Sequence, residues 1–195
     1  MKRQLQFPRI PPRWIAGAIL CTPLLIILAS TLAYYGGYRP DGSTNRGELL
    51  LPPQQVADTG WTLGGSAVEA LDLQGRWALV VFSPAGCGTQ AVQCREAWDA
   101  AGRVHQRLHK ERPRVHRYLL LPEGGDARSV LLGDSPDAFV LRGGSDFLAR
   151  ELAPDGVYSL TIDPLGNIVM LHQAGQFGRD LFDDLIKLLR LSQIG

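Results

Sequence analysis

Two cysteines seven residues apart, Cys87 and Cys94, have the most evident capacity for chemistry in this sequence. Neighbouring thiols can form a disulfide, exchange electrons with other thiols or bind a soft metal ion. On a continuous helix this separation spans about 10.5 Å, whereas a disulfide needs Cα atoms about 4.4 to 6.8 Å apart. The pair can therefore close only if the helix begins late, and Gly86, Gly88 and Thr89 favour such an irregular start.

The sequence leaves three interpretations of this cysteine pair open. Cys87 and Cys94 are a reversible or metal-binding pair, a structural disulfide, or a loop thiol and a separate core cysteine. An oxidising compartment normally closes thiols that lie close together. The location of the protein therefore bears directly on the chemistry of the pair.

The histidines are a second set of candidate ligands. His105 and His109 stand four residues apart on a predicted helix, a spacing at which one helix face can bind one metal ion. Basic residues surround them: Arg103, Arg107, Lys110 and Arg112. A cationic surround disfavours a metal ion, so we interpret this stretch as a solvated face. His116 and His172, on or after predicted strands, are interpreted as structural histidines.

A strand, a helix and a second strand are predicted around the cysteines. Residues 77–82 (WALVVF) form a short, apolar, β-rich run that is typical of a buried central strand. A helix over residues 90–110 follows, and small or apolar residues line one face of it: Cys94, Ala97, Ala101, Val104 and Leu108. Residues 115–121 (VHRYLLL) predict a second buried strand after Pro113. This order favours a parallel strand pair with a right-handed crossover.

The C-terminal part of the sequence predicts a hairpin and a helix. Strands over residues 157–162 and 168–171 flank the turn sequence DPLG at 163–166. The helix over residues 179–191 has one apolar face, with acidic residues early and basic residues late, as the helix dipole favours. Glycines interrupt residues 122–156, where we predict a short helix over 145–153 capped by Ser145.

An apolar segment over residues 14–35 predicts one transmembrane helix. About 20 apolar residues are enough to cross the hydrocarbon core of a bilayer. Trp14, Tyr34 and Tyr35 lie where aromatic rings favour the two interfaces, and Pro23 can be tolerated inside the helix. The first expected partner of this chain is therefore the membrane bilayer.

The charges that flank this segment predict its orientation. Basic residues without acidic ones precede it: Lys2, Arg3, Arg9 and Arg13. Arg39 and Arg46, which follow it, are accompanied by Asp41 and Glu48. The positive-inside rule then places the N-terminus in the cytoplasm. In a bacterium this predicts a single-pass inner-membrane protein, with a cytoplasmic tail over 1–13, a linker over 36–53 and a periplasmic domain over 54–195.

A cleaved signal peptide is the alternative interpretation of the apolar segment. Thr31 and Ala33 are small residues that could precede a cleavage site. The apolar run is longer than the roughly 7 to 15 residues of a signal core, which favours the anchor. Cys21 follows the bulky Leu20 rather than a small residue, so we interpret it as an apolar side chain of the helix and not as a lipidation site.

Composition excludes several classes of function. The chain has 20 basic and 19 acidic residues, and no basic run interleaved with aromatic residues, so nucleic acid is not an expected partner. Its 195 residues suffice for one folded domain besides the membrane segment. The sequence has no P-loop, no G-x-S-x-G elbow and no H-E-x-x-H helix, so nucleotide binding and hydrolysis by those sites have no support.

Two stretches carry a resemblance to a known family. Residues 74–94 (QGRWALVVFSPAGCGTQAVQC) and residues 160–170 (LTIDPLGNIVM) resemble thioredoxin-like proteins, most closely the membrane-anchored Sco-like proteins involved in cytochrome c oxidase assembly. The likeness covers about residues 56–191 and implies an α/β, thioredoxin-like fold (βαβ plus ββα) after one transmembrane helix. It further implies that Cys87 is the reactive thiol, because helix N-terminal amides stabilise a thiolate, with Cys94 as its redox or copper-binding partner.

The sequence also departs from that family at the site. The Sco-like pattern C-x-x-x-C is stretched to seven residues, and the copper-binding histidine eight positions before Asp163 is replaced by Asp155. Where thioredoxins have a cis-proline facing the cysteines, this chain has Val157 or Tyr158, with Pro154 a few residues away.

Two functions are therefore expected. The first is an assembly factor that acts on copper or on the thiols of a copper-binding subunit of a respiratory oxidase. If this protein is an enzyme, it is a thiol-disulfide oxidoreductase. The second is a non-catalytic thioredoxin-fold scaffold or interaction protein with structural cysteines.

Overall fold

The computed structural model describes residues 11–37, 44–68, 73, 75–88, 90–126, 130, 138–144 and 152–192. The chain divides into two units, Met1–Ser43 and Thr44–Gly195, which are described separately.

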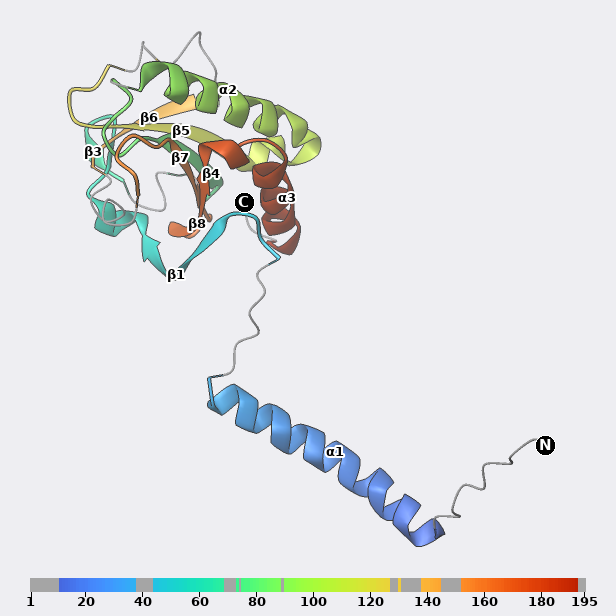
Figure 1. Cartoon of the computed structure of the whole chain (residues 1–195). Coiled ribbons are helices and arrows are strands. Elements are labelled where there is room, and N and C mark those ends of the chain that lie inside the picture. The colour runs from blue at the N-terminus through green and yellow to red at the C-terminus, as the bar shows by residue number, and fades with distance from the viewer. Residues whose placement is uncertain are drawn as a thin grey trace. The chain divides into compact units, whose positions relative to one another are not determined.

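The first unit is built on helix α1, Pro12–Tyr35 (Figure 1). Its 24 residues extend about 36 Å, enough to cross a hydrocarbon core of about 30 Å. None of its side chains is buried against protein, and Pro23 lies inside the helix. In the described part of the chain this is the helix that is long and apolar enough to span a membrane, in agreement with the predicted segment.

The centre of the second unit is the predicted strand–helix–strand and hairpin–helix arrangement. Strands β4 (Trp77–Phe82) and β5 (Val115–Leu121) are parallel and are connected through helix α2 (Ala91–Arg107). Strands β7 (Tyr158–Ile162) and β8 (Asn167–Gln173) form the antiparallel hairpin, and β7 also pairs with β4. Helix α3 (Arg179–Leu191) has the predicted bounds. The central order is therefore β8-β7-β4-β5 within a mixed sheet.

Four further strands extend this sheet and were not predicted. β6 (Ala138–Arg142) runs parallel to β5, and the short strands β2 (Thr62–Leu63) and β3 (Ser66–Ala67) follow it at that edge. β1 (Glu48–Gln55) pairs antiparallel with β8 at the opposite edge.

The prediction that residues 36–53 form a linker is wrong for its C-terminal part. The folded unit begins at Thr44 rather than at Gln54, because the backbone of β1 hydrogen-bonds to β8. The proline pair in β1, Pro52 and Pro53, is compatible with an edge strand, where a missing N–H breaks no central ladder.

Short 3-10 helices complete the unit: η1 (Val56–Thr59), η3 (His109–Arg114) and η5 (Ala174–Gln176). The predicted helix over 90–110 is thus shorter as an α-helix, and η3 continues it through Pro113. Of the predicted helix over 145–153, residues 145–151 lie outside the described residues, and Leu152 and Ala153 are not helical.

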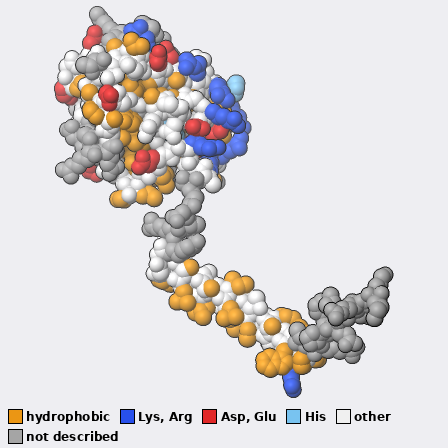
Figure 2. Space-filling model, in the orientation of Figure 1, with side chains coloured by type: hydrophobic (Ala, Val, Ile, Leu, Met, Phe, Trp, Pro, Cys, Tyr) orange, Lys and Arg blue, Asp and Glu red, His pale blue; other side chains and the backbone are white. Residues whose placement is uncertain are grey.

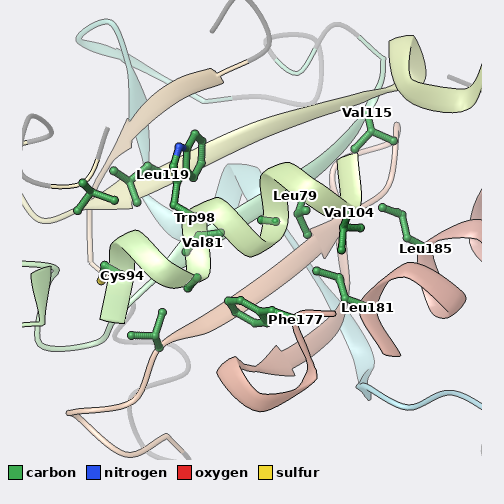
Figure 3. Close-up of a cluster of buried hydrophobic side chains, with 14 of the residues drawn as sticks. Leu79, Val81, Cys94, Trp98, Val104, Val115, Leu119, Phe177, Leu181 and Leu185 are labelled. Atoms are coloured by element: carbon green, nitrogen blue, oxygen red, sulfur yellow. The ribbon is translucent and has the colours of Figure 1, made fainter. Parts of the chain in front are cut away.

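Hydrophobic residues are buried on both faces of the sheet. On the face covered by α2 and α3, Leu79 and Val81 of β4 pack in a cluster with the predicted apolar face of α2 (Figure 3). On the other face, Ala78 and Val80 pack with residues of the segment 56–73. Because side chains of a strand alternate between faces, cover on both sides explains why every residue of β4 and β5 is buried and why β4 is a continuous apolar run.

Candidate thiol site

The chain leaves β4 at Phe82 and turns sharply before Cys87. The amide of Gly86 donates a hydrogen bond to the carbonyl oxygen of Ser83 (2.8 Å), which closes the turn. Gly86 has a φ of 81°, and a Cβ atom there would lie 3.1 Å from Cγ of Pro122. The positive φ favours glycine at this turn, and a side chain there would also be tight against Pro122.

Cys87 and Cys94 are joined by a disulfide, with their Cα atoms 5.8 Å apart. The pair can close because α2 begins at Ala91, so the chain between Cys87 and the helix is not helical. The late helix start that the glycines predicted is thus confirmed, and the interpretation of two unpaired thiols is wrong. Thr89 lies outside the described residues. The reversibility of this disulfide stays a prediction.

Both cysteines are buried, Cys87 being 1% and Cys94 0% exposed. Cys94 lies on the first turn of α2, at one end of the buried cluster (Figure 3). Val157 belongs to the same cluster, and the amide of Ala85 donates to the carbonyl oxygen of Pro154 (3.1 Å). The loop before β7 is thus hydrogen-bonded to the loop that carries Cys87. Because both sulfurs are buried, thiol exchange would require a local opening that exposes Cys87.

Copper does not fit the residues at this site. Copper ligation by cysteine needs thiolates, and the two sulfurs are bonded to each other. Asp155, at the position of the missing histidine, lies exposed in the turn before β7. Within the described ranges no group of three or more His, Cys, Asp or Glu side chains could hold a metal ion. The predicted copper site on Cys87 and Cys94 therefore lacks a ligand set in this state.

The predicted histidine pair is separated rather than brought together. His105 is buried, and its Nε2 lies 2.7 Å from the carbonyl oxygen of Val115. His109 is exposed at the start of η3. His116 is buried with its Nε2 2.6 Å from Nη1 of Arg76. The structural interpretation of His116 is thus confirmed, whereas His105 is a core residue and not part of a solvated face.

A second polar site, missed from the sequence, connects α3 to the start of the folded unit. Asp184 is 2% exposed, and its Oδ2 accepts hydrogen bonds from the amides of Arg46 and Gly47, both at 2.8 Å. Nε2 of the buried His172 lies 3.1 Å from the same oxygen. A Cβ atom on Gly47 would lie 2.5 Å from that His172 nitrogen, so the backbone must pass directly over the ring.

The position of Asp184 in α3 was the signal that could have revealed this site. Asp184 stands three residues after Leu181 and directly before Leu185, within the apolar face of the helix. The helix dipole accounts for acidic residues early in α3, but it does not explain a carboxylate on the buried face. A carboxylate on an apolar face needs buried donors, and here the donors come from a segment 137 and 138 residues away.

Burial lowers the pKa of His172 from its ordinary value, although the hydrogen bond and charge of Asp184 and the charge of Asp180 act in the opposite direction. The native protein thus resists protonation of this ring, whereas the unfolded chain takes up the proton near pH 6.5. The contribution of His172 to stability is therefore fully present above that pH and is lost as the pH falls toward the lower pKa of the folded state.

We expect the free energy of unfolding to fall by up to about 1.4 kcal/mol per pH unit below about pH 6.5 owing to His172. His172→Gln, which can still donate to Asp184 but does not titrate in this range, should remove that part of the slope. Urea denaturation of both proteins at several pH values measures the difference. Parallel pH curves for the two proteins would contradict the assignment.

The strand order, the covering helices and a disulfide between the first central strand and its helix define a thioredoxin-fold domain. The family model of the transmembrane-like, thioredoxin-like, C-terminal domain matches residues 77–192, and the chain belongs to this family. A search of curated proteins finds no match.

Several solved structures are similar to the chain. BsSco, a member of the Sco family of cytochrome c oxidase assembly proteins, is 15% identical, with a TM-score of 0.45, and the match covers 76% of this chain and 94% of BsSco. The bacterioferritin comigratory protein of Xanthomonas campestris is 13% identical (TM-score 0.46; 74% and 97% covered). ScoI of Arabidopsis thaliana, solved with copper bound, is 16% identical (TM-score 0.38; 75% and 99% covered). At these identities no activity carries over to this chain.

Proposed function

We propose that this protein is a membrane-anchored assembly factor for a respiratory oxidase that acts by thiol-disulfide exchange at Cys87 and Cys94. The observation that carries the proposal is the disulfide that joins Cys87, in the loop after β4, to Cys94, in the first turn of α2. This is the place where thioredoxin-fold proteins have their reactive cysteines. The apolar helix α1 supports an anchor, and the basic residues before it support a periplasmic domain in a bacterial inner membrane.

The exchange step takes a client disulfide and a dithiol donor. The dithiol donor first reduces the bond between Cys87 and Cys94 to two thiols and is itself oxidised to a disulfide. The Cys87 thiolate then attacks one sulfur of the client disulfide, and the other client sulfur leaves as a thiolate that takes up a proton. The Cys94 thiolate attacks Sγ of Cys87 in the mixed disulfide and releases the first client sulfur, so the client is reduced to two thiols and the pair returns to the disulfide. A copper-binding subunit fits this role as the client, because cysteines bind copper as thiolates.

A non-catalytic scaffold is the second candidate function. It is favoured by the burial of both sulfurs and by the hydrogen bond that ties the loop of Cys87, at Ala85, to Pro154. In this case the disulfide stabilises the start of α2, and partner binding uses the surface or the membrane helix.

Trapping of the client distinguishes the two functions. With Cys94→Ser, Cys87 has no internal partner, so we expect it to form a mixed disulfide with a copper-binding oxidase subunit, visible on non-reducing gels. Cys87→Ser with Cys94→Ser should then impair oxidase assembly in cells, whereas Cys21→Ser, in α1, should not. Protein levels in the membrane must be matched, because loss of the disulfide also affects stability. Normal assembly with the double variant and no mixed disulfide would leave only the scaffold.

A further inference from the structure

A basic surface lies where the end of α2, η3 and the outer side of α3 meet. It comprises exposed or half-buried cations: Arg103, Arg107, Lys110, Arg112, Arg114, Lys187 and Arg190. Figure 2 shows Lys and Arg side chains gathered on one side of the folded unit, around a few carboxylates. We call these seven residues the basic surface.

Contacts between the elements hold the basic surface together. The guanidinium of Arg107 lies 4.3 Å from the ring centroid of Phe182 on α3. Arg114 donates to the carbonyl oxygens of Leu189 (3.0 Å) and Ser192 (2.9 Å), and to Glu111 (2.8 Å). The hydrogen bond from Arg114 lowers the pKa of Glu111, and the charges of Arg114, Lys110 and Arg190 add to this effect. Cations from η3 and from α3 therefore lie close enough to lower the pKa of the same carboxylate, Glu111.

Apolar side chains adjoin the cations on α3. A shallow groove of about 430 Å³ is lined by Phe182, Ile186 and Leu191 together with Lys187, Arg190 and one acidic residue, Asp183. The carboxylate of Asp183 lies 3.6 Å from Nε of Arg179. Leu191 is 78% exposed. An apolar strip with a basic border is the composition that binds at the headgroup level of an anionic bilayer.

The chain enters the folded unit at the same surface. Nζ of Lys187 donates to Oγ1 of Thr44 and lies 3.2 Å from Oδ1 of Asn45. Residues 38–43 separate Thr44 from Gly37, the last described residue of the anchor unit. At no more than about 3.6 Å per residue, this connection reaches at most about 25 Å. The connection therefore keeps the basic surface close enough to the bilayer for direct contact with it.

We infer that the basic surface docks on anionic phospholipid headgroups of the membrane that α1 spans. The inference rests on the membrane anchor of the proposed function. Phosphates attract cations that come within the Debye length of about 10 Å, and the exposed apolar Leu191 adds contact area. The 17 residues of α2 extend about 25 Å from the basic surface to the end that carries Cys94. Docking would thus direct one end of α2 to the lipid and leave the disulfide end for a client.

The test uses the full chain in nanodiscs of phosphatidylcholine alone or mixed with phosphatidylglycerol. The readout is the rate at which a water-soluble acylating reagent modifies the amine of Lys110. We expect slower modification in the anionic nanodiscs, with the protection lost when salt shortens the Debye length to about 3 Å. Arg103→Gln with Arg190→Gln should weaken docking about 25-fold, since each cation contributes about five-fold.

A matched control changes the net charge equally at another place. Ser66→Glu with Gln93→Glu, both at exposed positions, should leave the protection of Lys110 intact. Equal modification of Lys110 in both nanodiscs, with α1 resistant to alkaline extraction, would overturn docking alone. Protection that appears only on addition of polyglutamate would assign the surface to an acidic protein and also overturn it. Extraction of the chain at alkaline pH would contradict the anchor itself and this inference with it.

Discussion

Replacement of Asp184 by alanine is expected to lower the free energy of unfolding by about 3 kcal/mol or more. The variant leaves the amides of Arg46 and Gly47 and the Nε2 of His172 without their shared acceptor. Gly47 and His172 are buried, so water cannot replace the carboxylate at these two groups without opening the contact, whereas Arg46 is exposed. Urea denaturation of the full chain in detergent micelles, followed by tryptophan fluorescence, measures the loss.

The adjacent Asp183 provides the matched control. It is half exposed and pairs with Arg179 at 3.6 Å, so Asp183→Ala should cost no more than about 1 kcal/mol. Hydrogen exchange adds a local readout. Relative to the wild type, Asp184→Ala should accelerate exchange of the amides of β1 more than that of the amides of β4, because Asp184 anchors the chain that leads into β1. Similar losses for the two alanine variants would show that Asp184 does not hold this segment.

Removal of the disulfide by Cys87→Ser with Cys94→Ser is expected to lower the free energy of unfolding by about 2 to 3 kcal/mol. The crosslink closes a short loop, with a sequence separation of 7, so its effect on the unfolded chain is at the lower end of the usual range. The two hydroxyls would also be placed among apolar side chains such as Trp98 and Val157. Chemical denaturation under non-reducing conditions measures the difference.

Two comparisons make this result specific. Cys21→Ser, at the cysteine that is free and exposed on α1, should leave the stability of the folded unit unchanged. Treatment of the wild type with a reductant should reproduce most of the loss, and only after a delay, because both sulfurs are covered in the native state. A double variant as stable as the wild type would mean that the disulfide does not support the fold. The structural role assigned to it under the scaffold function would then fail.

Local patterns in the sequence determined most of the central fold. The apolar run of α1, the β-rich runs of β4 and β5, the DPLG turn and the periodic face of α3 each require only neighbouring residues to be recognised. The late start of α2 could also be predicted, because the glycines before it favour non-helical backbone. These patterns were sufficient to predict a thioredoxin-like fold with Cys87 placed between a strand and a helix.

Only the tertiary structure decided what the polar and edge residues do. β1 contains two prolines and no alternating pattern, and it became a strand because β8 offers it an open edge. The spacing of Cys87 and Cys94 allowed a disulfide, but both cysteines are buried in a cluster with residues far away in the sequence, such as Val157 and Phe177. By its sequence position Asp184 is typical of an exposed residue near a helix start, but in the folded unit Gly47 and His172 pack against it. Burial and hydrogen bonding between distant segments depend on how the elements pack, and no local periodicity records that packing.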